Sequence, residues 1–238
     1  AAAVAGYSSV PVQVFAGPIL FNTVITGVGP GVAHVRASPE VAPDSVETTR
    51  WTYGALSAFA AVDTRDRVAF PSRGARLLAT AAWSPGAGAS FRHVTVNAER
   101  WIPLSPAVSL GTRVAATRAW GDDVPLDHVS FVGGDIVPAL GANQFFALYG
   151  AEALELVGTA SQVAALSAQA ELRPDLFVRA TVNAGRAGDG WTVAPDAYRT
   201  GLGVTLGTGT PIGPVELTLS TSDLGDTPQF AFSLGRAF

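Results

Sequence analysis

The chain of 238 residues contains no cysteine, no methionine and no lysine. Without cysteine it has neither a disulfide framework nor a thiolate metal site. Charged residues make up only 14% of the sequence, against about 25% in an ordinary soluble domain. The net charge is -4, and the arginines are scattered along the chain. With no basic cluster, nucleic acid is not an expected partner.

Long apolar runs are also missing, although hydrophobic residues make up 48% of the sequence. Serine, threonine, glycine and proline interrupt every apolar stretch before it reaches the roughly 20 residues of a transmembrane helix. The composition therefore leaves two classes, an unusually apolar all-β globule or a β-barrel whose outer face meets lipid.

Alternation of apolar with small or polar residues, the period of a strand, recurs at intervals of about 20 residues. It is clearest at the end of the chain, where Phe230, Phe232 and Phe238 alternate with small residues. Strands are predicted at or near 10–20, 31–37, 51–62, 77–83, 93–99, 108–117, 161–173, 176–183, 201–207, 215–220 and 230–238, and a further one at 1–8 is an open alternative.

The polar face of these strands carries small and hydroxylated residues and few charges, which is typical of a barrel lumen rather than a water-facing surface. The sequence therefore predicts an all-β fold, an antiparallel transmembrane β-barrel of about 12 strands. Connection lengths agree, with tight turns at 104–106, 173–175 and 211–214 and long ones at 120–157 and 187–197. Tryptophans near strand ends would form an aromatic girdle: Trp83, Trp101, Trp120 and Trp191.

Three segments occur in a combination that is more specific than any one of them. They are Asp63-Thr-Arg65 with Phe70-Pro71 and Gly74, then Phe131-Val-Gly133-Gly134, then the strands from Gly201 to the terminal Phe238. In this order they resemble the periplasmic turn, the start of the inward-folded extracellular loop and the last three strands of the BamA-like surface-antigen superfamily of outer-membrane barrels.

That resemblance implies a bacterial outer-membrane location, with the lipid bilayer as partner. It implies that Phe230, Phe232 and Phe238 form the insertion signal read by the outer-membrane assembly machinery. The resemblance further implies a barrel of 16 strands, the usual number in this superfamily. We therefore expect residues 1–238 to be a single barrel domain at the C-terminal end of a longer protein, and a complete barrel of about 12 strands is the competing interpretation.

The chain departs from the translocating and assembly members of the family at one charge pair. Their loop carries an arginine that pairs with an aspartate on a later strand, whereas here the loop reads Leu148-Tyr149-Gly150 and the strand reads Asn183-Ala184-Gly185. This pattern is closer to the barrels of patatin-type phospholipase autotransporters. It implies a membrane anchor or secretion module for a covalently linked upstream domain, and a protein-translocation or membrane-protein assembly barrel is the alternative.

Charged and polar residues of both signs fall on the lumen phase of the strands: His93, Glu99, Arg113, Glu171, Arg173, Arg179 and Asn183. Mixed signs favour a network that fills the lumen over an ion-selective pore, which would show a ring of one sign. No metal-ligand spacing, cofactor motif or catalytic constellation is present. An enzyme is not expected, and a barrel hydrolase using His93 or His128, near Asp127 and Ser130, is a third hypothesis.

Overall fold

The computed structural model describes residues 4–17, 19–20, 24–39, 49–86, 88–134, 144–211 and 213–235. The wall strands are β1 Val4–Gln13, β2 Ile19–Leu20, β3 Val24–Pro39, β4 Thr49–Asp63, β5 Gly74–Gly86, β6 Ala89–Pro103, β7 Val108–Gly121, β11 Ala160–Arg173, β12 Leu176–Gly188, β13 Arg199–Thr208, β14 Val215–Ser222 and β15 Gly225–Leu234. Three short strands are β8 Ser130–Val132, β9 Phe145–Phe146 and β10 Leu156–Gly158, and two 3-10 turns are η1 Leu126–His128 and η2 Pro195–Ala197.

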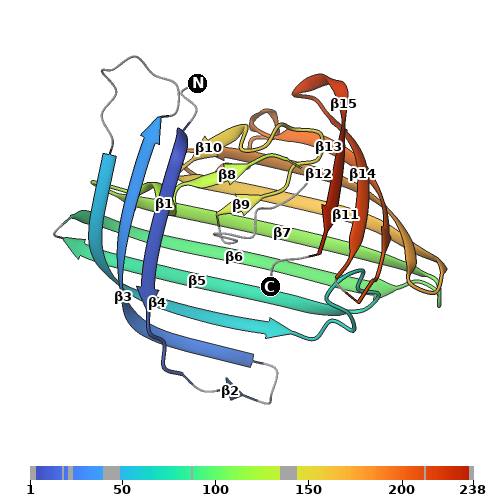
Figure 1. Cartoon of the computed structure of the whole chain (residues 1–238), viewed down its shortest axis with the longest axis horizontal. Helices are drawn as coiled ribbons and strands as arrows, with labels where there is room; N and C mark the ends of the chain where they lie inside the picture. Colours follow the sequence, from blue (N-terminus) through green and yellow to red (C-terminus); the bar gives the residue numbers. More distant parts are fainter. Residues whose placement is uncertain are drawn as a thin grey trace.

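The wall is a 12-stranded antiparallel sheet in the order β1-β3-β4-β5-β6-β7-β11-β12-β13-β14-β15, with β2 paired to β3. It curls around the small sheet β10-β8-β9 (Figure 1). Within the described residues no ladder joins β1 to β15. The expected all-β antiparallel barrel fold is confirmed. No described helix is long and apolar enough to cross a membrane.

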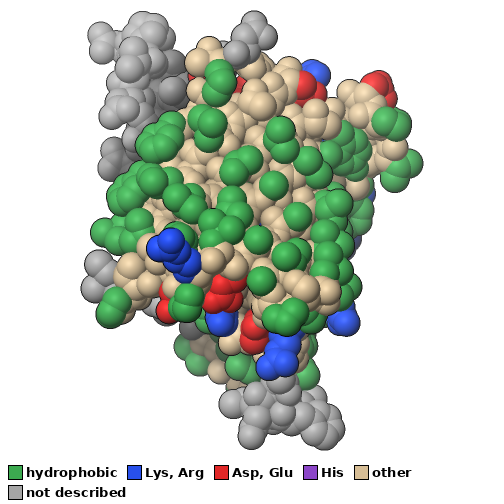
Figure 2. Space-filling view, turned by 90° about the vertical axis from the view of Figure 1, so that its right-hand side faces the viewer, with side chains coloured by type: hydrophobic (Ala, Val, Ile, Leu, Met, Phe, Trp, Pro, Cys, Tyr) green, Lys and Arg blue, Asp and Glu red, His purple; other side chains and the backbone are tan. Residues whose placement is uncertain are grey.

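Apolar side chains point outward from the wall and small or polar ones point inward. On β13, Leu202, Val204 and Leu206 are 44 to 47% exposed, while Gly203 and Thr205 between them are buried. Thr95 and Thr117, by contrast, are almost completely buried. This is the reverse of a soluble protein, in which large apolar side chains are inside. Figure 2 shows one face on which hydrophobic side chains are widely spread and charged ones are few.

The two ends of the wall differ in their connections. The end that holds residues 64–73, called the turn end, also holds the β6–β7, β11–β12 and β13–β14 turns, and the long connections 122–159 and 189–198 lie at the other end, called the loop end. The expected alternation of short and long connections holds only in part. Two-residue connections join β5 to β6 and β14 to β15 at the loop end, and the β4–β5 turn spans ten residues.

Two strand predictions near the N-terminus are wrong in their bounds. The segment 10–20 is not one strand but the end of β1, a single bridge at Ala16 and β2. The segment 31–37 belongs to β3, which is 16 residues long. The alternation of β3 is hard to read because its buried inner positions include Gly27 and Gly29, whose lack of a side chain hides the lumen face in the sequence.

Trp101 is not part of an exposed girdle. It lies on β6 in the same phase as His93, and it is buried inside the barrel against Gly111 of β7. Its indole nitrogen donates to Glu99. The other three tryptophans of the prediction are exposed, and all three lie at the loop end: Trp83, Trp120 and Trp191.

Candidate functional site in the lumen

The connection from β7 to β11 folds back into the lumen. Val132, Phe146 and Leu148 are fully or almost fully buried and pack against Ala115 of β7 and Val163 of β11. These two wall residues belong to the inward phase of their strands. The connection is thus anchored to the inner wall by an apolar cluster of its own side chains.

The predicted loop motif lies at the start of this inward fold. Phe131 stacks on Phe145 with ring centroids 5.2 Å apart. Gly133 and Gly134 have φ angles of 142° and 77°, where side chains are rarely tolerated. A Cβ atom at Gly133 would collide with the carbonyl oxygen of Glu152. The two glycines allow the chain to turn tightly after β8.

The tip of the connection rests on the glycine-lined inner face of β13. A Cβ at Gly203 would lie 2.7 Å from the Tyr149 ring, and one at Gly201 would collide with the Tyr149 carbonyl oxygen. Asn183 of β12 lies beside them, and the amide orientation that satisfies both of its ends donates to the Gly201 carbonyl (3.2 Å) and accepts from the Tyr149 N–H (3.1 Å). Neutral hydrogen bonds and packing therefore hold the tip.

Gly203→Val is expected to displace this tip, because a side chain would occupy the position of the Tyr149 ring. Overpacking costs about 1–3 kcal/mol, so a cysteine at the buried Ala151 should react with a maleimide about ten-fold faster than without the substitution. The chain has no native cysteine to interfere. Gly54→Val is the matched control, because its nearest atom would be 3.8 Å away. Equal rates in both variants would contradict the contact.

The β4–β5 turn enters the lumen from the other end and crosses to the opposite wall. Phe70 is only 2% exposed and stacks on Phe177 of β12 with ring centroids 4.7 Å apart. Gln169 of β11 donates to the Pro71 carbonyl (3.1 Å), and a Cβ at Gly207 of β13 would collide with the Phe70 ring. A segment that connects β4 and β5 is thereby packed against β11, β12 and β13.

Ion pairs and hydrogen bonds shape the same turn. The Arg65 guanidinium is almost buried and contacts Asp63 (2.7 Å) and Glu99 of β6 (3.3 Å). The hydrogen-bonded carboxylate of Asp63 raises the pKa of Arg65. The Asp66 carboxylate accepts from the backbone N–H groups of Ser72 and Arg73. Together with the φ of 100° at Gly74, these contacts fix the path of the turn.

Residues of the predicted lumen network have individual partners. His93 contacts the hydroxyl of Thr117 (2.9 Å), and the Arg113 Nε donates to Asn97 (3.3 Å). Two nitrogens of the Arg179 guanidinium donate to the side-chain amide oxygen of Gln169. The guanidinium carbon of Arg179 also lies 5.3 Å from the Phe70 ring centroid and 5.2 Å from the Trp101 ring centroid.

Glu171 pairs with Arg67 of the β4–β5 turn at 3.5 Å. Arg173 is exposed at the end of β11, where the register shifts between Glu171 and Arg173. Its place in the lumen network stays a prediction.

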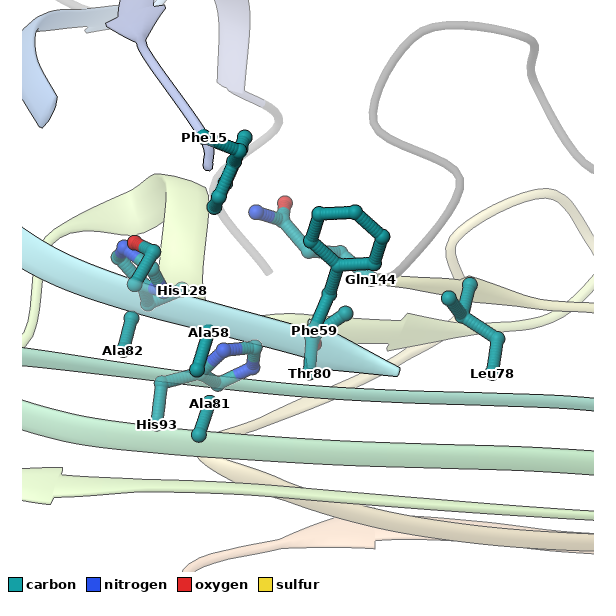
Figure 3. A pocket seen from close by; sticks show the side chains of 11 residues that line it. Phe15, Ala58, Phe59, Leu78, Thr80, Ala81, Ala82, His93, His128 and Gln144 are labelled. Atoms are coloured by element: carbon teal, nitrogen blue, oxygen red, sulfur yellow. The ribbon is translucent and has the colours of Figure 1, made fainter. Parts of the chain in front are cut away.

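A cavity of about 290 Å³ opens on the inner wall beside two histidines (Figure 3). His93 comes from β6 and His128 from η1, and their ring centroids are 4.7 Å apart. The Tyr53 hydroxyl donates to Asp127 (2.6 Å) and so accepts from the His128 Nε2–H (3.0 Å). Burial, with a smaller contribution from neighbouring His93, lowers the pKa of His128 to about 3.

This cluster does not assemble a hydrolytic triad. The Ser130 hydroxyl donates to the Gly158 carbonyl, Asp127 accepts from Tyr53, and His128 is bonded to that same hydroxyl. Among the described residues no group of three or more histidine, aspartate or glutamate side chains could hold a metal ion. The cluster instead joins η1 to β4 and β6.

Sequence reasoning missed the residues that make these long-range contacts. These residues lie far along the chain from the segments they contact. Tyr53 and Gln169 form hydrogen bonds with residues at least 74 positions away. Gly207 lies under the ring of Phe70. The available signal was limited to the run of inward-phase glycines on β13, which indicates that something approaches that face closely.

A curled antiparallel wall with apolar residues outside and its own loop inside defines an outer-membrane type of β-barrel. Residues 22–238 match the Omp85 superfamily domain, and the chain belongs to this superfamily. It is similar in fold to the crystal structure of BamA from Haemophilus ducreyi lacking POTRA domains 1-3, with a TM-score of 0.69 and 14% identity. The match covers 89% of this chain and 50% of that one, so the chain spans about half of its length. No curated protein matches.

Membership of this superfamily locates the chain in the bacterial outer membrane. The short turns of such barrels face the periplasm and the longer loops face the exterior. On this general rule we infer that the turn end, with residues 64–73, faces the periplasm and that the loop end faces the cell surface.

Proposed function

We propose that this barrel is a membrane anchor or secretion module for a domain covalently linked upstream of it, a domain of the patatin type. The observation that carries the proposal is the filled lumen. The β7–β11 connection occupies it from the surface side and the β4–β5 turn from the periplasmic side. Segments of the chain itself stand where a conduit would need open space.

The uncharged contacts that hold the tip of the β7–β11 connection support the same function. In members that move polypeptides, as the resemblance implies, a charge pair holds the loop. Asn183 and the Tyr149 backbone form an uncharged contact instead. Removing only one member of a buried charge pair would leave an uncompensated charge, so the two charges are expected to be lost together. Their joint absence supports a loop that stays in the lumen.

The proposal includes three roles that the sequence motifs suggest. Residues 1–238 form one barrel domain. Phe230 and Phe232, which point outward on β15, act with Phe238 as the insertion signal, and Phe238 lies outside the described residues. Any hydrolase activity of the protein resides in the upstream domain, and the assembly machinery of the outer membrane is a partner only during insertion.

A second candidate function is protein translocation or membrane-protein assembly. Membership of the Omp85 superfamily and the fold shared with BamA support it. We call the β7–β11 connection and the β4–β5 turn the plug segments. In this alternative function, they would have to leave the lumen, or the wall would have to open, each time a protein is moved or assembled.

A deletion strain distinguishes the two functions. If the barrel is an anchor, other heat-modifiable β-barrels in the outer-membrane fraction should stay at their normal amounts, because an anchor acts only on the domain linked to it. If it is an assembly barrel, several should fall together. Quantitative mass spectrometry of the fraction, with the full-length gene restored on a plasmid as control, gives the answer. A coordinated fall would overturn the anchor function.

A further inference from the structure

Arginines and tryptophans gather on the outer wall at the surface end of the barrel. We call them the Arg–Trp band: Trp83, Arg92, Arg118, Trp120, Arg186 and Trp191. Arg92 of β6 lies directly opposite Trp83 of β5 on one side and Trp120 of β7 on the other. All the members on strands belong to the phase that points away from the lumen.

Arg118 lies at the centre of the band between two indole rings. Its guanidinium carbon is 5.9 Å from the ring centroids of both Trp120 and Trp191. The Trp191 indole is itself fixed by donating to the Thr117 carbonyl (2.8 Å). The Arg118 Nε is buried and has no hydrogen-bond partner among the described residues. Within the described residues, the two indole rings hold this side chain in place and its Nε–H has no acceptor.

The positive charge of the band is not compensated by the described part of the chain. No carboxylate there lies within ion-pair distance of Arg92, Arg118 or Arg186. Arg186 donates to the side chain of Gln162 and to the Gly190 carbonyl, which are neutral acceptors. Arginines whose charge is not paired with a carboxylate attract anions, and their planar guanidinium groups match phosphate oxygens well.

The position of the band relative to the bilayer follows from β6. Arg92 and Arg100 share its outer phase, and the residues of that phase between them are Val94, Val96 and Ala98. Eight residues span about 27 Å along a strand, which on a tilted strand covers most of an apolar band roughly 25 Å tall. Arg92 therefore lies at the surface-side interface, where tryptophan also prefers to be.

We propose that the Arg–Trp band binds the phosphate groups of phosphorylated glycolipids in the outer leaflet. The arginines donate to the phosphate oxygens, and the tryptophans pack at headgroup level and hold the Arg118 guanidinium in register. Bare phosphate lacks the acyl chains that place a headgroup at this depth, so a lipid is the ligand. This site does not depend on whether the barrel serves as an anchor or in assembly.

The test uses the purified, folded full-length protein in detergent micelles, with diphosphorylated lipid A as probe and native mass spectrometry as readout. Bound lipid A is expected on the wild type. The double variant Arg92→Gln, Arg118→Gln should bind lipid A at least about ten-fold more weakly. This loss corresponds to one charge-assisted hydrogen bond. Arg100→Gln is the matched control, an exposed arginine on the same face of β6 at the periplasmic end, and should bind normally.

Two further probes define the chemistry. Dephosphorylated lipid A should bind at least about ten-fold more weakly, and inorganic phosphate should not compete at equal concentration. Equal binding of the dephosphorylated lipid, effective competition by phosphate or unchanged binding by the double variant would each overturn the proposal. If the double variant fails to fold, Arg92→Gln alone serves, because this side chain is exposed on the surface and should still weaken binding.

Discussion

Replacing Val204 with arginine should lower the free energy of unfolding by about 2–4 kcal/mol, the cost of a cation on the lipid face near mid-bilayer. Val204 lies near the middle of β13, and its cross-strand neighbours are Ala180 of β12 and Leu219 of β14. Neither can neutralise the charge. Denaturant unfolding from phospholipid vesicles, followed by tryptophan fluorescence, measures the change.

The control carries the same substitution to the membrane boundary. Leu104→Arg places an arginine at an exposed position in the β6–β7 turn, where the cost should stay within about 1 kcal/mol. If both variants lost the same amount of stability, the outer face of β13 would not lie in hydrocarbon. The anchoring function and the Arg–Trp band would then both lose their basis.

The sequence predicts which side chains point to lipid and which to the lumen where the two faces of a strand differ clearly in residue type. On β13, leucine and valine alternate with glycine and threonine, and the structure places the first set outward and the second inward. Period two is a direct consequence of strand geometry, and a shift by one residue would exchange the two faces. Such a pattern therefore determines fold class and orientation together.

Predictions failed where the signal was short or mixed. The strands β8, β9 and β10 have two or three residues each, too few for a period to be recognised, and their pairing depends on how the connection packs against the wall. Trp101 was assigned outward because it is a tryptophan near a strand end. Its phase, shared with His93 eight residues earlier, places it inside, and the phase was the better guide.

Contacts across the lumen left no pattern to follow. Tyr53 donates to Asp127 from a position 74 residues away, and no local spacing encodes such a pair. The same applies to the β4–β5 turn, which contacts β11 to β13 across the lumen in addition to the nearby β4 and β6. Pairing within the wall is local and periodic, whereas the filling of the lumen depends on side-chain shapes that meet only after the wall has curled.

β13 links these two levels of organisation. Its outer face is apolar and its inner face is nearly free of side chains, so both plug segments rest on it, Tyr149 near Gly203 and Phe70 near Gly207. Glycines in a strand interior cost conformational entropy and packing. The contacts made by the two aromatic rings offset that cost, which explains how a strand with so little inner surface remains well placed in the wall.

Phe70→Ala should remove the periplasmic half of this arrangement. Truncating a fully buried phenylalanine costs about 3–5 kcal/mol, and here the ring stacks on Phe177 and lies under the Arg179 guanidinium. Phe70 also has a φ of 50°, in the left-handed region, so its contacts must outweigh a strained backbone. We expect a loss of unfolding free energy of that size and a higher ion conductance in planar bilayers, because the mouth is no longer filled.

Val68→Ala separates the role of the ring from that of the turn. Val68 lies in the same turn but is exposed, so this substitution should change stability by less than about 0.5 kcal/mol and leave conductance unchanged. Phe70→Leu should fall between the two, since leucine fills part of the space beside Gly207. A Phe70→Ala variant as stable and as non-conducting as Val68→Ala would mean that the turn does not close the lumen. The barrel would then need another barrier, and the β7–β11 connection is the segment placed to provide it.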